Sequence, residues 1–381
     1  APPTPELERP PTELQQVAYD IPEGIEVDDR IVVKGTVGEA IVQLESALDL
    51  VTWEIANNLK ERKVMVVWML DASGSLVGQR KLVHKRLKRI YGELDALERV
   101  GQLPMRDQPL LSAVVSYGQK TTFLTKSPTD QFPEIEKAFG MLKADQSGRE
   151  NVFTAVCQVM SLWGHYRNKQ GRQIMLVAIT DEAGDDHGAP LEVAINRCRR
   201  KGAKAYVIGP SAPFGARKGY VPYVAPENGK TYQLPVDLGP DAAIPSLVRL
   251  PFWFSGPQYN RPPLSSGFAP YALARLVTET GGIYFMSKMT TMAGLTPLGH
   301  YDAAAMRPFE PDYSYASPAD CLKDIARHPL RMAVYNASIA SRQFQANSTP
   351  RLDIRVTPGN FKQVASDAQK SVAESGLMID Q

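Results

Sequence analysis

The chain has little cysteine, no marked excess of either charge and no long apolar run. Its three cysteines (Cys157, Cys198 and Cys321) lie far apart without a CxxC pair, which argues against a disulfide framework or a zinc site, so we expect each to be a small buried residue. Lysine and arginine number 43 and aspartate and glutamate 41, so net charge gives no reason to expect nucleic acid or an anionic membrane as the main partner. The longest apolar run, residues 64–70, is far short of the roughly 20 residues that span a bilayer.

Motifs of common enzyme classes are also missing. The sequence contains no nucleophile elbow, HExxH, GxGxxG or complete phosphate loop, so we expect a protein without catalytic activity. No signal peptide is present, and the chain begins at Ala1 rather than at methionine. This beginning fits cleavage of a signal peptide, a proteolytic end or the first ordered residue, which leaves export to the periplasm or cell surface as an open expectation.

Apolar periodicity divides the chain into three parts. Residues 1–35, rich in proline and acidic side chains, are expected to form an extended arm. Residues 36–290 are expected to form one α/β domain, and residues 291–381 a helical and irregular C-terminal extension. Within the domain we expect strands near 64–70, 110–117, 120–125, 173–180, 203–208 and 283–286, and helices near 38–61, 76–97, 129–143, 151–166, 189–200 and 270–280.

The alternation of these elements predicts a doubly wound, mostly parallel sheet with helices on both faces. The tight connection at Gly118-Gln119 predicts that the strands on either side of it are antiparallel, which adds one antiparallel edge strand. An insertion at about 210–265 contains the turn Pro226-Glu227-Asn228-Gly229, which predicts a hairpin, and the cluster Phe252-Trp253-Phe254, for which packing and binding both stay open. Because the insertion follows the carboxyl end of a strand, we expect it at the edge of the sheet where such folds bind ligands.

Side chains that carry oxygen gather at the ends of two predicted strands. Asp71-Ala72-Ser73-Gly74-Ser75 leads from the strand at 64–70 into a helix, Thr154 lies near the start of a helix, and Asp181 ends a later strand. In a doubly wound sheet these positions meet at one edge. A hard cation such as Mg²⁺ takes oxygen ligands and keeps some waters, which suits hydroxyls with carboxylates behind them. If the two carboxylates act through water, the ion stays electrophilic and favours an added carboxylate from a partner.

These residues resemble the metal-ion-dependent adhesion site of von Willebrand factor A domains, and the resemblance covers about residues 63–286. It implies that Ser73, Ser75 and Thr154 bind the ion directly or nearly so, and that Asp71 and Asp181 bind it directly or through water. The implied ion is Mg²⁺, with Mn²⁺ or Ca²⁺ as alternatives. More narrowly, the helix leading into Trp68 and the segment 267–285 resemble bacterial, planctomycete-type proteins that carry this domain.

Two features depart from the family pattern. Positions 77 and 78 are Val and Gly, so the sequence lacks the acidic pair that integrin-type domains use for a second cation. The insertion at 210–265 has no counterpart in the minimal fold.

Plainer interpretations stay open for two of these features. Asp71 and Ser75 could merely cap the helix that follows them. Asp185-Asp186-His187 could add a metal ligand or an acidic collar to the same edge, or form an ordinary solvated loop.

The sequence thus predicts a metal-dependent adhesion or assembly module that grips an Asp or Glu of a protein partner, self-assembly included. One alternative is a scaffold subunit that makes its contacts through the arm and the tail. Another is a Mg²⁺-dependent hydrolase, with Glu182 or His187 as the nearby general base.

Overall fold

The computed structural model describes most of the predicted domain and part of the C-terminal extension. The described residues are 36–42, 44–104, 106–214, 217–224, 228–243, 265–287, 310–314 and 317–347. The predicted arm at 1–35 and the aromatic cluster Phe252-Trp253-Phe254 lie outside them.

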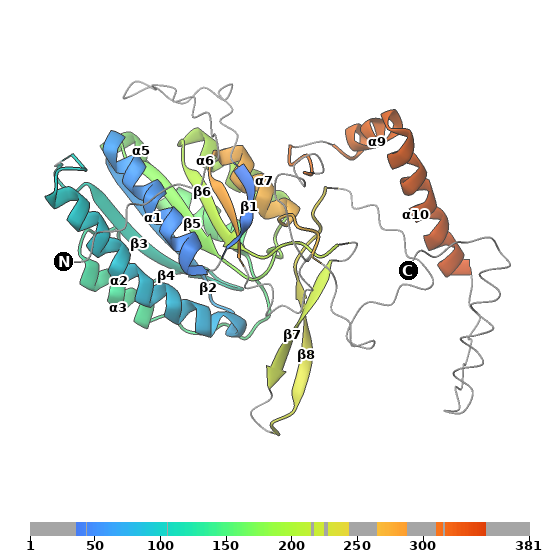
Figure 1. The fold of residues 1–381 in the computed structure, drawn as a ribbon, viewed down its shortest axis with the longest axis horizontal. Helices are drawn as coiled ribbons and strands as arrows, with labels where there is room; N and C mark the ends of the chain where they lie inside the picture. Colours follow the sequence, from blue (N-terminus) through green and yellow to red (C-terminus); the bar gives the residue numbers. More distant parts are fainter. Residues whose placement is uncertain are drawn as a thin grey trace.

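A seven-stranded sheet occupies the centre of the fold, in the order β1-β9-β6-β5-β2-β3-β4 (Figure 1). Every neighbouring pair is parallel except β3 and β4, which are antiparallel. This arrangement confirms the predicted sheet with its single antiparallel edge strand. The strands are β1 (Thr36–Val42), β2 (Val64–Asp71), β3 (Leu110–Tyr117), β4 (Thr122–Phe123), β5 (Gln173–Ile179), β6 (Lys204–Gly209) and β9 (Ile283–Ser287).

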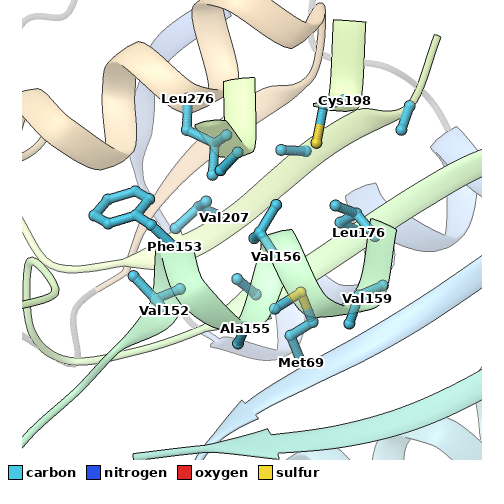
Figure 2. Close-up of a cluster of buried hydrophobic side chains, with 14 of the residues drawn as sticks. Met69, Val152, Phe153, Ala155, Val156, Val159, Leu176, Cys198, Val207 and Leu276 are labelled. Carbon is cyan, nitrogen blue, oxygen red and sulfur yellow. The ribbon is translucent and has the colours of Figure 1, made fainter. Parts of the chain in front are cut away.

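Helices cover both faces of the sheet, as predicted. Successive side chains of a strand point to opposite faces, and β2 shows the result: Met65, Val67 and Met69 belong to one buried cluster and Val66, Trp68 and Leu70 to the other. The first cluster is completed by α4 (Val152–Trp163), α6 (Ala189–Arg200) and α7 (Tyr271–Thr280). The second is completed by α1 (Leu44–Glu61), α2 (Val77–Arg99) and α3 (Phe132–Gly140). Figure 2 shows Val152, Val156 and Val159 of α4 among the buried side chains of the first cluster.

The start of the domain differs from the sequence prediction. A helix was expected over 38–61, but Thr36–Val42 forms β1 and the helix begins at Leu44. Ile41 matches the helical spacing of the apolar residues after it, so periodicity alone assigns it to the helix. The free edge of β9 supplies parallel backbone partners for this segment, and such tertiary pairing overrides a local period.

The predicted hairpin is present in the insertion. Strands β7 (Lys218–Val224) and β8 (Thr231–Asp237) pair antiparallel and extend beyond the sheet (Figure 1). The Ala183 N–H donates to the Asp237 carbonyl at 2.9 Å, so the base of the hairpin is tied to the loop that follows β5. The hairpin therefore lies at the carboxyl edge of the sheet, as expected.

Short elements and a helical pair complete the described fold. A 3₁₀ turn, η1 (Gly74–Leu76), leads into α2, and α5 (His165–Gln170) follows α4. After the sheet, α9 (Pro318–Arg327) and α10 (Pro329–Asn347) follow each other and stand apart from the sheet in Figure 1. No helix in the described ranges is long and apolar enough to cross a membrane.

The cysteine prediction holds for one residue of three. All three thiols are free, and Cys198 is fully buried in the cluster under α6. Cys157 and Cys321 are only partly buried, so the expectation was wrong for these two. Both lie on helices, where a residue at the margin of the apolar stripe is half covered.

Arg172 holds together the amino ends of three strands. Its side chain is 1% exposed, and its guanidinium donates to the carbonyls of Val64 at 3.1 Å, Pro109 at 3.3 Å and Gln108 at 2.8 Å. Gln108 has a φ of 45°, in the left-handed region that a residue with a side chain rarely adopts. Arg172 thus joins the backbone at the start of β2 to the turn before β3, although the Pro109 carbonyl also accepts the Val64 N–H at 2.8 Å.

We expect Arg172→Met to lower the free energy of unfolding by about 3 kcal/mol, because buried carbonyls lose a charged donor. Urea denaturation measures the change. Arg200→Met removes an exposed arginine of α6 and is expected to stay within about 0.5 kcal/mol of the parent. Equal stabilities for the two variants would contradict this role of Arg172.

Candidate metal centre

The loop after β2 is folded back on itself by short hydrogen bonds. The Asp71 carboxylate accepts the N–H of Ser73 at 2.7 Å, and the hydroxyls of Ser73 and Ser75 lie 2.9 Å apart. Arg80, one turn into α2, donates to the carbonyls of Asp71 at 2.8 Å and Ser73 at 2.6 Å. The residue that caps α2 is Leu76, without a side-chain hydrogen bond. The interpretation of Asp71 and Ser75 as simple helix caps is therefore wrong.

Three buried carboxylates meet behind this loop. Asp71, Glu150 and Asp181 are 1%, 3% and 8% exposed, and each offers a carboxylate oxygen within 4.8 Å of the others. Asp71 ends β2 and Asp181 follows the adjacent strand β5, so the parallel pairing of these strands brings them together. Glu150 comes from the segment just before α4. The sequence analysis predicted Asp71 and Asp181 but missed Glu150.

The predicted hydroxyl residues are more exposed than the three carboxylates. Ser75 is exposed and Ser73 is partly exposed, whereas the carboxylates are buried. Thr154 is half-buried at the third residue of α4, and its hydroxyl has no hydrogen-bond partner among the described residues. The Thr180 hydroxyl, which the prediction left out, lies 3.3 Å from both Asp71 Oδ2 and Glu150 Oε2. Ser73 and Ser75 thus lie toward solvent, while the Thr180 hydroxyl is buried among the carboxylates.

The acidic loop after Asp181 has a structural role in the described fold. The Asp186 carboxylate accepts the N–H groups of Phe153 at 3.2 Å and Thr154 at 2.6 Å, at the amino end of α4 where helix N–H groups lack internal partners. Asp185 accepts the N–H of Glu150 at 2.9 Å. These bonds fasten the loop after β5 to the start of α4. Asp185 and Asp186 therefore have backbone partners of their own, and neither belongs to the group of Asp71, Glu150 and Asp181.

Burial and mutual repulsion favour the protonated form of these acids. Burial raises the pKa of Asp181 to about 7, with a further contribution from the charge of Asp71 and an opposing one from hydrogen bonding with Ser75. Burial, followed by the charges of Asp181 and Asp71, raises the pKa of Glu182 to about 8. Burial also raises the pKa of Asp71, and it raises that of Glu150 well above its usual range. The folded chain thus holds several carboxyl groups that are costly to ionise without a cation.

The donor set fits a divalent cation. Oδ1 of Asp181 is buried without a hydrogen-bond partner, and no ion pair joins any of the three carboxylates to a basic side chain among the described residues. An ion among Asp71, Glu150 and Asp181 would supply the missing positive charge. Carboxylate and hydroxyl oxygens are the ligands of hard cations, so the group suits a divalent cation that takes oxygen ligands.

Comparison with known proteins gives matches of structure only. No family model and no curated protein matches the sequence. The hypothetical protein BatB from Bacteroides thetaiotaomicron is 12% identical, with a TM-score of 0.36 over 65% of this chain and 95% of that one. The mussel byssus protein PTMP1, with a zinc-occupied MIDAS motif, is 16% identical (TM-score 0.32; 40% of this chain, 36% of that one). A von Willebrand factor type A protein from Catenulispora acidiphila is 16% identical (TM-score 0.28; 39% and 33%). The chain spans about a third of the length of the latter two.

The sheet and the site together identify the fold. Six parallel strands carry helices on both faces, the edge strand β4 is antiparallel, and the DxSxS loop leaves the carboxyl end of a central strand. The fold is a von Willebrand factor A-like α/β fold, as predicted. The acidic group of Asp71, Glu150 and Asp181 lies at the carboxyl edge of this sheet and could form a MIDAS-like metal site.

We expect the metal-free protein to become less stable as the pH rises. A carboxyl group whose pKa is higher in the folded chain than in the unfolded chain destabilises the fold once it ionises, and for Asp181 this occurs between about pH 4 and about pH 7. The melting temperature in EDTA should therefore fall over this range and fall less steeply in Asp181→Asn. Asp95→Asn, an exposed change on α2, is the control. Parallel curves for parent and Asp181→Asn would contradict the assignment.

Proposed function

We propose that this chain is a metal-dependent protein-interaction module without catalytic activity. The observation that carries the proposal is the unpartnered, buried Oδ1 of Asp181 within the acidic group, which calls for a cation at the edge of the sheet. The ion we propose is Mg²⁺. In this proposal Asp71 and Asp181 hold it from the buried side, and Ser73, Ser75 and Thr154 line its outer side.

The outer position of the hydroxyls supports binding of a partner's carboxylate. Neutral hydroxyl ligands leave more charge on the ion than carboxylates do, and Mg²⁺ keeps waters that an incoming oxygen can replace. Because Ser75 is exposed, a group from another molecule can approach from that side. We propose that this group is an Asp or Glu side chain, and that the module acts in adhesion or assembly.

The hairpin extends the surface next to this site. Asp237 at the end of β8 binds the Ala183 N–H, two residues after Asp181, and forms an ion pair with Arg217 at 2.8 Å. A partner held by the ion would thus meet the base of the hairpin. We propose that the insertion contributes to the choice of partner, which the minimal A-type fold would make with its loops alone.

Calorimetric titration of Mg²⁺ into metal-stripped protein tests the proposal. We expect about one ion per chain, at least tenfold weaker binding in Asp71→Asn, and loss of binding in Asp71→Ala and Asp181→Ala, because each change removes a carboxylate from the group. Asp95→Asn should bind like the parent. Acetate, as the simplest carboxylate, should bind the Mg²⁺-loaded protein and should not bind the metal-stripped protein.

Two results would refute the proposal. One is the absence of saturable metal binding in the parent chain. The other is an unchanged Mg²⁺ affinity in both Asp71 variants, provided that their circular dichroism shows an intact fold.

A further inference from the structure

Glu150 is the member of the acidic group that the DxSxS-Thr-Asp pattern does not contain. Its main chain fixes its place: the N–H donates to Asp185 Oδ2 at 2.9 Å, and the carbonyl accepts from the Asp185 N–H at 2.9 Å. These two bonds join the loops without using the Glu150 side chain. The backbone bonds therefore do not explain why the Glu150 side chain is buried.

The partners of that side chain are a second acid and a hydroxyl, and neither of them carries positive charge. Its carboxyl group is hydrogen-bonded to that of Asp71, which requires a proton between the two and helps to raise the pKa of Glu150. It is 3% exposed, and its Oε2 lies 3.3 Å from the Thr180 hydroxyl. That hydroxyl has one hydrogen and two other acceptors, Asp71 Oδ2 at 3.3 Å and the Glu182 carbonyl at 3.1 Å. A glutamate that serves structure is paired elsewhere in this fold, as Glu192 is with Arg275. Among the described residues no basic side chain forms an ion pair with Glu150. A buried carboxylate without a cation is costly, so a bound ion is the partner that fits.

The spacing of the three carboxylates suits one ion. Their oxygens lie within 4.8 Å of one another. Ligand oxygens on opposite sides of one ion are about 4 Å apart around Mg²⁺ and about 5 Å apart around Ca²⁺. We propose that Glu150 is a third carboxylate ligand that strengthens metal retention and lowers the attraction of the loaded site for a partner's carboxylate. This inference rests on the proposed function, since it concerns the same ion.

The charge at the site gives the reason for both effects. Asp71 and Asp181 together balance a divalent ion, and Arg80 adds a positive charge beside them, so an ionised Glu150 lowers the net charge of the loaded site by one unit. The extra ligand holds the ion more tightly, and the extra charge repels an incoming carboxylate. Removal of the Glu150 charge should therefore change the two affinities in opposite directions. A residue that only stabilised the loops would not produce this result.

Binding of Mn²⁺ to the full chain, followed by electron paramagnetic resonance of the free ion and by water-proton relaxation, tests the proposal. In Glu150→Gln we expect Mn²⁺ affinity to fall by about 10- to 100-fold. The relaxation of the bound ion should show about one more coordinated water, in the place of the lost ligand. Acetate affinity of the Mn²⁺-loaded protein should rise by about fivefold.

Two further variants separate the effect of the Glu150 charge from the effect of its side-chain length. Glu150→Asp keeps the charge but shortens the side chain, so it should bind Mn²⁺ more weakly without a gain in acetate affinity. Glu182→Gln makes the same chemical change at a partly buried neighbour outside the acidic group and should leave the water count unchanged. The proposal fails if Glu150→Gln matches Glu182→Gln in water count and acetate affinity while the parent binds both probes. If the parent binds no Mn²⁺, the proposed function fails as well.

Discussion

The concentration of negative charge at the carboxyl ends of β2 and β5 is the constraint on which the surrounding loops depend. Parallel pairing of these two strands puts Asp71 and Asp181 next to each other, and the approach of Glu150 adds a third acid with almost no exposure. A packed protein interior disfavours such a group strongly. It persists because the folded scaffold fixes each residue through main-chain bonds and strand pairing, which act whether or not the acids are ionised.

The loops around the acids are cross-linked in a way that preserves their positions. Arg80 binds the carbonyls of the loop after β2, while Asp185 and Asp186 bind main-chain groups at the start of α4. Gly184, with a φ of 86°, lies so close to Val152 that a Cβ there would come within 2.6 Å of its side chain. The segments that carry Asp181 and Glu150 are therefore held against each other, and metal binding needs little rearrangement of this part of the site.

The sequence predicted the elements of the sheet well and the acidic group in part. The run from Val64 into Asp71 and the strand before Asp181 were recognisable because a buried strand followed by polar residues has a strong local pattern. Glu150 was missed because it follows a polar loop and lies outside any strand, so no period or motif distinguishes it from a solvated acid. β1 was missed for a related reason: its partner, β9, lies more than 200 residues away, and a local period cannot reveal that pairing.

The third carboxylate also changes how the resemblance to A-type domains should be used. The sequence predicts a site with two carboxylates and three hydroxyl ligands, which would leave a divalent ion able to attract another anion. With Glu150 among the ligands, that attraction would be weaker, and partner binding would depend more on contacts around the ion. The hairpin β7–β8 lies next to the loop that carries Asp181. Among the described elements outside the sheet and its helices, it is placed to make such contacts with a partner. An ion that attracts carboxylates only weakly would leave the choice of partner to the surrounding surface. Selectivity would then come from the shape of the partner rather than from its charge alone.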